Sequence, residues 1–335
     1  MDTYTISSKD YDGIIGFTPT RLFNPLFAWE VNKKLEFSLD MGLLNDHIQV
    51  TTTYFRNIST NQLVGIPMPA TTGFTSLRAN LDAKVKNTGL EIQLNTVNFR
   101  KKHFNWTTSF NITFPKNELV EFPDLAGSTY ANTYVIGKSL NIKKLYHNLG
   151  VNPETGIYEF EDYNNDGVIS SGNDKKFIID FSTKFYGGLA NHLSYKNWDL
   201  DFFFQFSQKT AYNYAAQIYT SGNQPALTLE NRWHKPGDQA YLQKYTAGGN
   251  STAQTAADRF YSSNEAYADA SYIRLKNLSI AYTIPETILK RMKCSLYLQG
   301  QDLLTFTKYK GPDPEQPGQQ IGMIKRVNFG VQFNF

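Results

Sequence analysis

The residues with the clearest chemistry lie in one acidic stretch near the middle of the chain. Asp162, Asn164 and Asp166 place oxygen atoms at alternate positions, and a glycine follows directly. This spacing matches the first half of a calcium-binding loop, with ligands at positions 1, 3 and 5 and glycine at position 6. The carboxylate expected at position 12 is displaced, because Asn173 stands there and Asp174 follows one residue later. Two interpretations stay open: a calcium site held by Asp162, Asn164 and Asp166, or a tight turn that favours the same residue types.

Aromatic residues gather in a long stretch that lacks a strand pattern, residues 213–270. Tyr214, Tyr219, Trp233 and Tyr241 belong to it. Flat rings stack on sugars and on peptide side chains, so these four are candidate ligand-binding residues. A loop of this length also needs a small core of its own. Packing is therefore the competing interpretation for each ring taken singly.

Catalytic and nucleic-acid chemistry find little support in the residue types. The five histidines are scattered, and neither a His-Glu-x-x-His nor a Gly-x-Ser-x-Gly motif occurs. Cys294 is the single cysteine, so the chain can build neither an internal disulfide nor a cysteine-based metal site. Lys and Arg number 33 against 30 Asp and Glu, and this net charge of +3 gives no reason to expect nucleic acid as a partner. We expect no enzyme and no catalytic residues.

The elements that would position the candidate residues are strands. Hydrophobic and polar residues alternate with a period of two, which indicates half-buried β-strands. The alternating segments are 35–41, 48–54, 90–96, 104–114, 185–195, 198–207, 271–283, 296–298 and 327–335. Within 271–283 the alternation slips near Asn277, which predicts a β-bulge.

Short and long connections alternate strictly between these segments. The two longest connections are 115–182 and 213–270. Outer-membrane barrels have this arrangement, with tight periplasmic turns and long external loops. An ordinary antiparallel sandwich has no reason to alternate in this way, so the pattern favours part of a transmembrane β-barrel. Aromatic residues at 15% and charged residues at 19% suit such strands.

The alternation also predicts which residues would meet lipid. Phe204 and Val331 belong to the apolar sides of their segments, whereas Gln205 and Gln332 belong to the polar sides. In a barrel wall the apolar side faces the bilayer and the polar side faces water.

Several motifs resemble a known protein family. They are Ser271-Tyr-Ile-Arg-Leu-Lys-Asn277, Ala281-Tyr-Thr-Ile-Pro285 and Gln299-Gly-Gln-Asp302-Leu-Leu-Thr-Phe306-Thr-Lys-Tyr309, with Lys184-Phe-Tyr-Gly-Gly-Leu189 as an earlier landmark. Together they are similar to the C-terminal barrel portion of the SusC/RagA family of TonB-dependent outer-membrane transporters. The resemblance runs over nearly the whole chain.

The resemblance implies an all-β fold, with residues 1–335 supplying roughly nine antiparallel strands of a transmembrane barrel of about 22 strands. Residues 213–270 would form a long external loop. The plug domain, TonB box and signal peptide of the family have no counterpart here, so the resemblance implies a piece of a longer protein.

The function implied by the resemblance is TonB-driven import of glycan oligomers or peptides across the cell outer membrane. A SusD-like surface lipoprotein, the TonB complex and the lipid bilayer would be the partners. Calcium is the one cofactor suggested, since similar Asp-x-Asn-x-Asp-Gly loops occur in the family. The alternative is a soluble secreted β-protein that binds calcium and glycan.

Overall fold

Nine strands form the largest sheet of this computed structural model. The structure describes residues 3–20, 24–74, 76–214, 224, 226–285, 287, 292–317 and 321–334. The strands of the sheet are β3 (Val31–Leu43), β4 (Ile48–Thr60), β7 (Lys84–Lys101), β8 (Phe104–Glu121), β13 (Phe185–Tyr195), β14 (Trp198–Gln208), β17 (Tyr272–Thr283), β18 (Lys293–Thr307) and β19 (Arg326–Asn334). Their order is β19-β18-β17-β14-β13-β8-β7-β4-β3, so each strand pairs with its neighbours along the chain.

The nine alternating segments of the sequence correspond to these nine strands, and the predicted all-β fold is confirmed. The end of the last segment, Phe335, lies outside the described residues. The predicted bulge is present as well, because the register of β17 shifts between Leu275 and Asn277 against both neighbouring strands.

The chain divides into two compact units, and β3, β4, β7 and β8 contribute residues to both. The first unit covers residues 1–36, 55–88 and 117–140. Two antiparallel hairpins belong to it, β1 (Tyr4–Tyr11) with β2 (Ile14–Pro19) and β5 (Gln62–Pro67) with β6 (Ser76–Leu81), beside the short 3-10 turns Ala70–Thr72 and Leu125–Gly127. Its small core consists of Ala83, Val85, Leu119 and Phe122.

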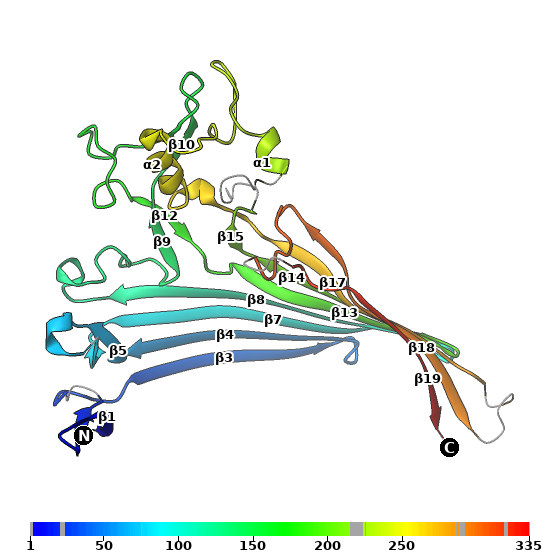
Figure 1. The fold of residues 1–335 in the computed structure, drawn as a ribbon. Helices are drawn as coiled ribbons and strands as arrows, with labels where there is room; N and C mark the ends of the chain where they lie inside the picture. Colours follow the sequence, from blue (N-terminus) through cyan, green and yellow to red (C-terminus); the bar gives the residue numbers. More distant parts are fainter. Residues whose placement is uncertain are drawn as a thin grey trace. The chain divides into compact units, whose positions relative to one another are not determined.

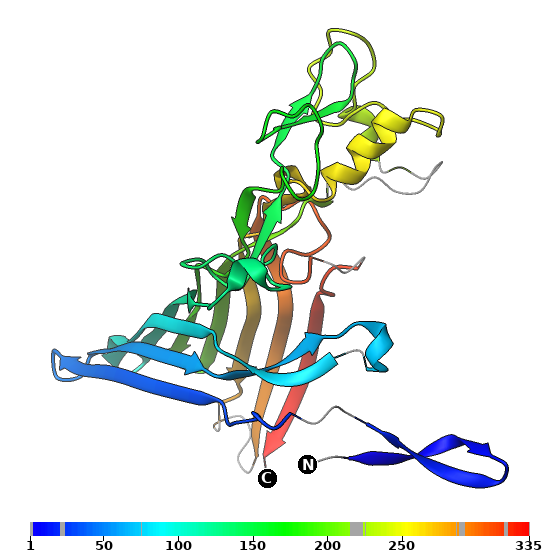
Figure 2. The same cartoon turned by 90° about the vertical axis from the view of Figure 1, so that its left-hand side faces the viewer.

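The second unit covers residues 37–54, 89–116 and 141–335. Figures 1 and 2 show β13, β14, β17 and β18 side by side as long strands. Its loop elements are β9 (Ile142–Leu145), β10 (Asn148–Val151), β11 (Tyr158–Phe160), β12 (Phe177–Asp180), β15 (Thr210–Tyr212), β16 (Tyr267–Asp269), α1 (Ala226–Glu230), α2 (Ser251–Phe260) and the 3-10 turn Asn264–Ala266. β9 pairs with β12, β10 with β11, and β15 with β16.

Helix α2 begins at a defined cap and buries one face. The Asn250 side chain accepts a hydrogen bond from the backbone N–H of Ala253, which satisfies one free donor of the first turn. Ala253, Ala256 and Phe260 follow at helical spacing and are buried. Within the described part of the chain, none of the helices has the length and apolar character needed to span a bilayer.

Candidate functional site

The register of the central strands gives the sheet two chemically different faces. On the first face, which we call the polar face, one row joins Ser109, Ala190, Phe203, Asn277 and Gln301, and the next joins Thr107, His192, Asp201, Ser279 and Gln299. On the opposite face, the apolar face, one row joins Phe110, Leu189, Phe204, Leu275 and Leu304, and another joins Trp106, Leu193, Leu200, Ile280 and Leu298. Because the side chains of a strand alternate, a residue and its chain neighbour lie on opposite faces.

Aromatic rings mark both ends of the apolar face. Phe104, Tyr195, Trp198 and Tyr282 form one row near the short turns, and Phe114, Phe185, Phe206 and Phe306 lie near the other ends of the strands. Within these sets, the ring centroids of Trp198 and Tyr282 are 4.7 Å apart, and those of Phe114 and Phe185 are 6.1 Å apart.

The spacing between the two aromatic ends suits a bilayer. Ten residue steps separate Phe185 from Tyr195 on β13, which is about 33 Å along a strand. A strand tilt of about 40° reduces this length to ~25 Å, the height of the apolar band in outer-membrane barrels. The apolar face therefore has the dimensions and the aromatic belts of a lipid-facing wall.

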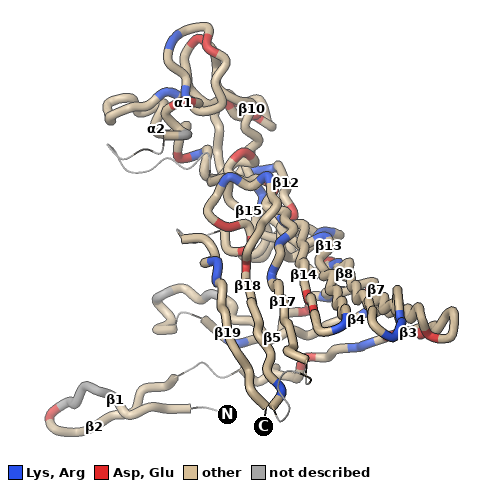
Figure 3. The backbone as a smooth tube through the Cα atoms, turned by 90° about the vertical axis from the view of Figure 1, so that its right-hand side faces the viewer, with Lys and Arg blue, Asp and Glu red and all other residues tan. Residues whose placement is uncertain are grey.

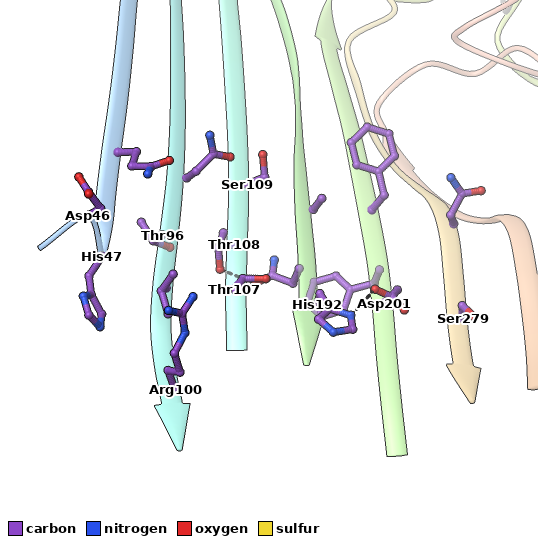
Figure 4. Close-up of a pocket in the computed structure, with 18 of the residues that line it drawn as sticks. Asp46, His47, Thr96, Arg100, Thr107, Thr108, Ser109, His192, Asp201 and Ser279 are labelled. Carbon is purple, nitrogen blue, oxygen red and sulfur yellow. Dashed lines mark hydrogen bonds and ion pairs between the residues drawn. The ribbon is translucent and has the colours of Figure 1, made fainter. Parts of the chain in front are cut away.

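The polar face carries a hollow that we call the wall groove, with a volume of about 630 Å³. Thr107, Ser109, His192, Asp201 and Ser279 line it, and Figure 4 shows these side chains on neighbouring strands. His192 Nδ1 and Asp201 Oδ1 are 2.7 Å apart, and both side chains are about half exposed. The lining therefore combines hydroxyl, amide and imidazole groups with the charged side chains of Asp46, Arg100 and Asp201.

A second hollow, the bulge pocket, adjoins the wall groove, and both include Phe203 and Asn277. Its volume is about 480 Å³, and Asn111, Gln205, Asn277, Gln301, Lys276 and Asp302 line it with Phe203. The Lys276 ammonium lies 3.0 Å from an Asp302 carboxylate oxygen. Asp302 has a φ of 52°, a left-handed backbone that is uncommon outside glycine and marks the bulge on β18.

A buried arginine lies at the loop end of β17 and gathers acidic groups around itself. The Arg274 side chain is only 1% exposed, and its Nη2 donates to both carboxylate oxygens of Asp313 at 2.8 Å. Its Nη1 donates to Glu315 at 2.8 Å, and Lys276 lies 3.1 Å from the same carboxylate. We call Arg274, Lys276, Asp302, Asp313 and Glu315 the Arg274 cluster. It fastens the segment after β18 to the wall.

Asp313 also organises the backbone of that segment. Its carboxylate accepts hydrogen bonds from the backbone N–H groups of Glu315 and Met323. Burial alone would raise the pKa of Asp313, but the hydrogen bonds from Arg274, Met323 and Glu315 outweigh it, so this pKa lies below its usual range. The carboxylate is therefore ionised at neutral pH and holds the segment in place.

Three of the four candidate aromatic residues are described, and each of these lies in structural contacts. Tyr214 packs against the small cluster that contains Tyr309. Trp233 Nε1 donates to the carbonyl of Pro153 at 2.8 Å. Tyr241 is 45% exposed, and its hydroxyl donates to Glu265 at 3.2 Å. Tyr219 lies outside the described residues. Ligand binding by Tyr214, Trp233 and Tyr241 stays a prediction.

The two longest connections share one hydrophobic core. Tyr146, Tyr158 and Phe160 come from the first connection, and Leu242, Ala256, Phe260 and Ala266 come from the second. The rings of Tyr158 and Phe260 stack with centroids 4.6 Å apart, and burial raises the pKa of Tyr158. At the base of this loop module, Lys143 Nζ lies 5.2 to 5.4 Å from three ring centroids, those of Phe181, Tyr212 and Tyr267. The module thus has the core that a loop of this length requires.

The acidic stretch 162–174 folds as a set of hydrogen-bonded turns. Asp162 accepts from the N–H of Gly167, and Asp166 accepts from the N–H of Val168. Asp174 is fully buried and accepts from the backbone of Tyr163 and Ser170, which closes the loop. Among the described residues, no three His, Cys, Asp or Glu side chains converge as metal ligands. These bonds suit the turn interpretation, and the calcium site stays a prediction.

Sequence reasoning identified neither Phe203 nor Arg274 as a functional residue. Both residues depart from the sequence pattern around them. Phe203 places a large ring on the polar side of an alternating strand, and Arg274 places a charge inside the motif Ser271–Asn277. Figure 3 shows basic and acidic residues interspersed along the chain, so charge pattern alone does not single out Arg274.

The chain is similar to curated TonB-dependent receptors over about nine-tenths of its length. It is 29% identical over 331 residues to TonB-dependent receptor P3 of Formosa agariphila, covering 90% of this chain and 32% of that protein. It is 26% identical over 324 residues to TonB-dependent receptor SusC of Bacteroides thetaiotaomicron, covering 88% of this chain and 30% of SusC. The chain thus spans about a third of the length of the curated relatives it matches. No family model matches it.

The fold of the chain is similar to solved structures of the RagAB transporter. The structure of the RagAB peptide transporter aligns with a TM-score of 0.79 at 22% identity, covering 100% of this chain and 38% of the other. The RagAB peptide importer in the open-open state aligns with a TM-score of 0.78 at 21% identity and the same coverage.

In sequence and in fold the chain is similar to part of a TonB-dependent transporter. The resemblance to the SusC/RagA family is confirmed by the named relatives and by the shared fold. TonB-dependent receptors are outer-membrane proteins, which confirms the expected location. The relatives carry the names of receptors and importers, not of enzymes.

Proposed function

We propose that this chain forms part of the wall of an outer-membrane channel that imports glycan oligomers or peptides with energy from TonB. The observation that carries the proposal is the two-faced sheet. Its apolar face presents rows of aliphatic and aromatic residues between aromatic belts, and its polar face carries two hydrophilic hollows. A wall between lipid and an aqueous passage needs this division.

The alternative, a soluble secreted protein that binds calcium and glycan, is not favoured. On the apolar side of the C-terminal strand, Phe329 is 72% exposed and Phe333 is 52% exposed. A soluble protein rarely leaves a contiguous apolar face of this kind uncovered. The similarity to TonB-dependent receptors points the same way.

The expected partners follow from the resemblance. A SusD-like surface lipoprotein would cover the external side, where the long loop 213–270 would meet it. The TonB complex would act through a part of the protein outside this chain. The candidate rings Tyr214, Trp233 and Tyr241 belong to the module and are the residues we assign to ligand or lipoprotein contact.

Deletion of the gene for the complete protein tests this function. We expect the deletion strain to lose growth on one glycan or peptide mixture, and we expect TonB depletion to produce the same loss. An affinity-tagged protein should co-purify with a surface lipoprotein. Unchanged uptake of all glycans and peptides after deletion would contradict the proposal.

A further inference from the structure

Four side-chain amides without a hydrogen-bond partner among the described residues line the bulge pocket. Asn111, Gln205, Asn277 and Gln301 come from four different strands, β8, β14, β17 and β18, and line one hollow. Within the described chain, the side-chain amides of these four residues make no hydrogen bond. Each amide offers two donors and one acceptor oxygen, so the pocket can both give and accept several hydrogen bonds.

The pocket also contains a flat aromatic surface held at a fixed place. Phe203 lies against Gly188, where a Cβ atom would come within 2.4 Å of the ring. Glycine at this position therefore lets the ring lie against β13. The polar face of β14 carries this ring between Asp201 and Gln205, in a strand whose other rings lie on the apolar side.

The charges in the bulge pocket compensate each other. Lys276 and Asp302 form an ion pair of 3.0 Å, and they are the charged residues of the lining. A charged ligand would have to compete with this pair, whereas a neutral ligand rich in hydroxyl groups would not. A volume of about 480 Å³ is enough for a small-molecule site, since such sites occupy ~300–1,000 Å³.

We propose that the bulge pocket is a carbohydrate subsite on the wall, which binds one sugar ring of a neutral oligosaccharide. The sugar lies with its flat side on Phe203, and its hydroxyl groups bond to the amides of Asn111, Gln205, Asn277 and Gln301. The proposal rests on the proposed function, because the polar face must be reached from the import passage.

The test is site-specific labelling of the complete protein in intact cells. In the background, Cys294 and any cysteine in the parts of the protein outside this chain are replaced by serine. Ser279→Cys places a thiol in the wall groove, on the polar face two residues from Asn277, which lines both hollows. Leu278→Cys places its matched control on the apolar face. The reagent is a charged methanethiosulfonate, and the probes are maltohexaose, cellohexaose, laminarihexaose and xylohexaose, with octaglycine and hexagalacturonate for comparison.

We expect the Ser279→Cys thiol to react quickly and the Leu278→Cys thiol to resist. At least one neutral hexasaccharide should slow the reaction at least threefold, whereas octaglycine and hexagalacturonate should not. Adding Phe203→Leu should abolish the protection, and Phe204→Leu on the apolar face should preserve it.

Three results would overturn the subsite. A thiol at 279 that does not react would mean that another protein segment covers the polar face where the wall groove adjoins the bulge pocket. Protection by none of the neutral sugars, or equal protection by octaglycine or hexagalacturonate, would also contradict it. TonB-dependent uptake is measured in the same strains: uptake without sugar protection refutes the subsite alone, and sugar protection without uptake refutes the proposed function.

Discussion

At the scale of single residues, Arg274 connects the motif Ser271–Asn277 to later parts of the chain. Its side chain is buried and surrounded by carboxylates from two later segments of the chain, β18 and the loop after it. A buried guanidinium persists only when its charge is paired and its donors are used. The motif around Arg274 and the motif around Asp302 are thus two halves of one ion cluster.

Replacement of this arginine should release the segment after β18. In Arg274→Met the carboxylates of Asp313 and Glu315 remain without their main partner, and loss of one member of a buried pair costs about 3–5 kcal/mol. We expect a lower unfolding temperature of the purified protein and new protease cleavage within residues 308–317. Arg100→Met, which removes an exposed arginine, is the control and should leave both properties unchanged. Equal behaviour of the two variants would refute the role of the cluster.

The same cluster predicts a dependence on pH. The pKa of Asp313 lies below its usual range, so its stabilising charge is fully present above the unfolded value of about 4 and is lost as pH falls through the lower folded value. Amide hydrogen exchange of residues 309–317 and 321–323 should therefore stay slow from neutral pH down to about pH 4 and accelerate below it. Asp313→Asn should remove this acid transition. A transition above pH 5 in the wild type would contradict the assignment.

At the scale of elements, the strands were predictable and the loop module was not. The nine strands follow from strict alternation, because a strand with one apolar and one polar face carries that pattern over its whole length. The loop elements carry no such period: β9 to β12 have three or four residues each. Their stability comes from contacts between two connections far apart in sequence, such as Tyr158 with Phe260. The local sequence pattern therefore cannot predict these contacts.

The same reasoning applies to the candidate site. The polar face could be predicted from alternation, but the two hollows on it could not. They depend on the close approach of Phe203 to Gly188 and on the bulge at Lys276 and Asp302. Both features are set by the register between strands, which a single sequence does not display.

The shared core of the loop module predicts a local effect of mutation. Phe260 is 1% exposed, and its truncation to alanine should cost about 3–5 kcal/mol within the module. We expect Phe260→Ala to insert into the membrane normally but to be cleaved by external protease faster than the wild type, within both 141–181 and 213–270. Tyr261→Ala, at a neighbouring position with 38% exposure, is the control. Cleavage that becomes faster than in the wild type only within 213–270 would show that the two connections do not depend on each other.

At the scale of the whole molecule, the alternation of short and long connections predicts an orientation. Protease added to intact cells should cut the wild-type complete protein within 115–182 or 213–270, because these connections would lie outside. Residues 43–46 and 196–197 belong to short turns and should be cut only after the outer membrane is opened. Cleavage confined to the short turns of intact cells would reverse the orientation.

The central claim is that one face of the sheet meets lipid and the other meets water. Phe204 and Gln205 are neighbours on β14 but lie on opposite faces, and Val331 and Gln332 are the equivalent pair on β19. An arginine that faces lipid at mid-depth costs ~2–4 kcal/mol, whereas a polar-face arginine stays in water.

Membrane fractionation and heat-modifiable gel mobility of four arginine variants of the complete protein test this claim most directly. We expect Phe204→Arg and Val331→Arg to insert poorly. Gln205→Arg and Gln332→Arg should insert and fold like the wild type. Equal insertion of all four variants, or a wild-type protein recovered in the aqueous fraction without detergent, would contradict the account.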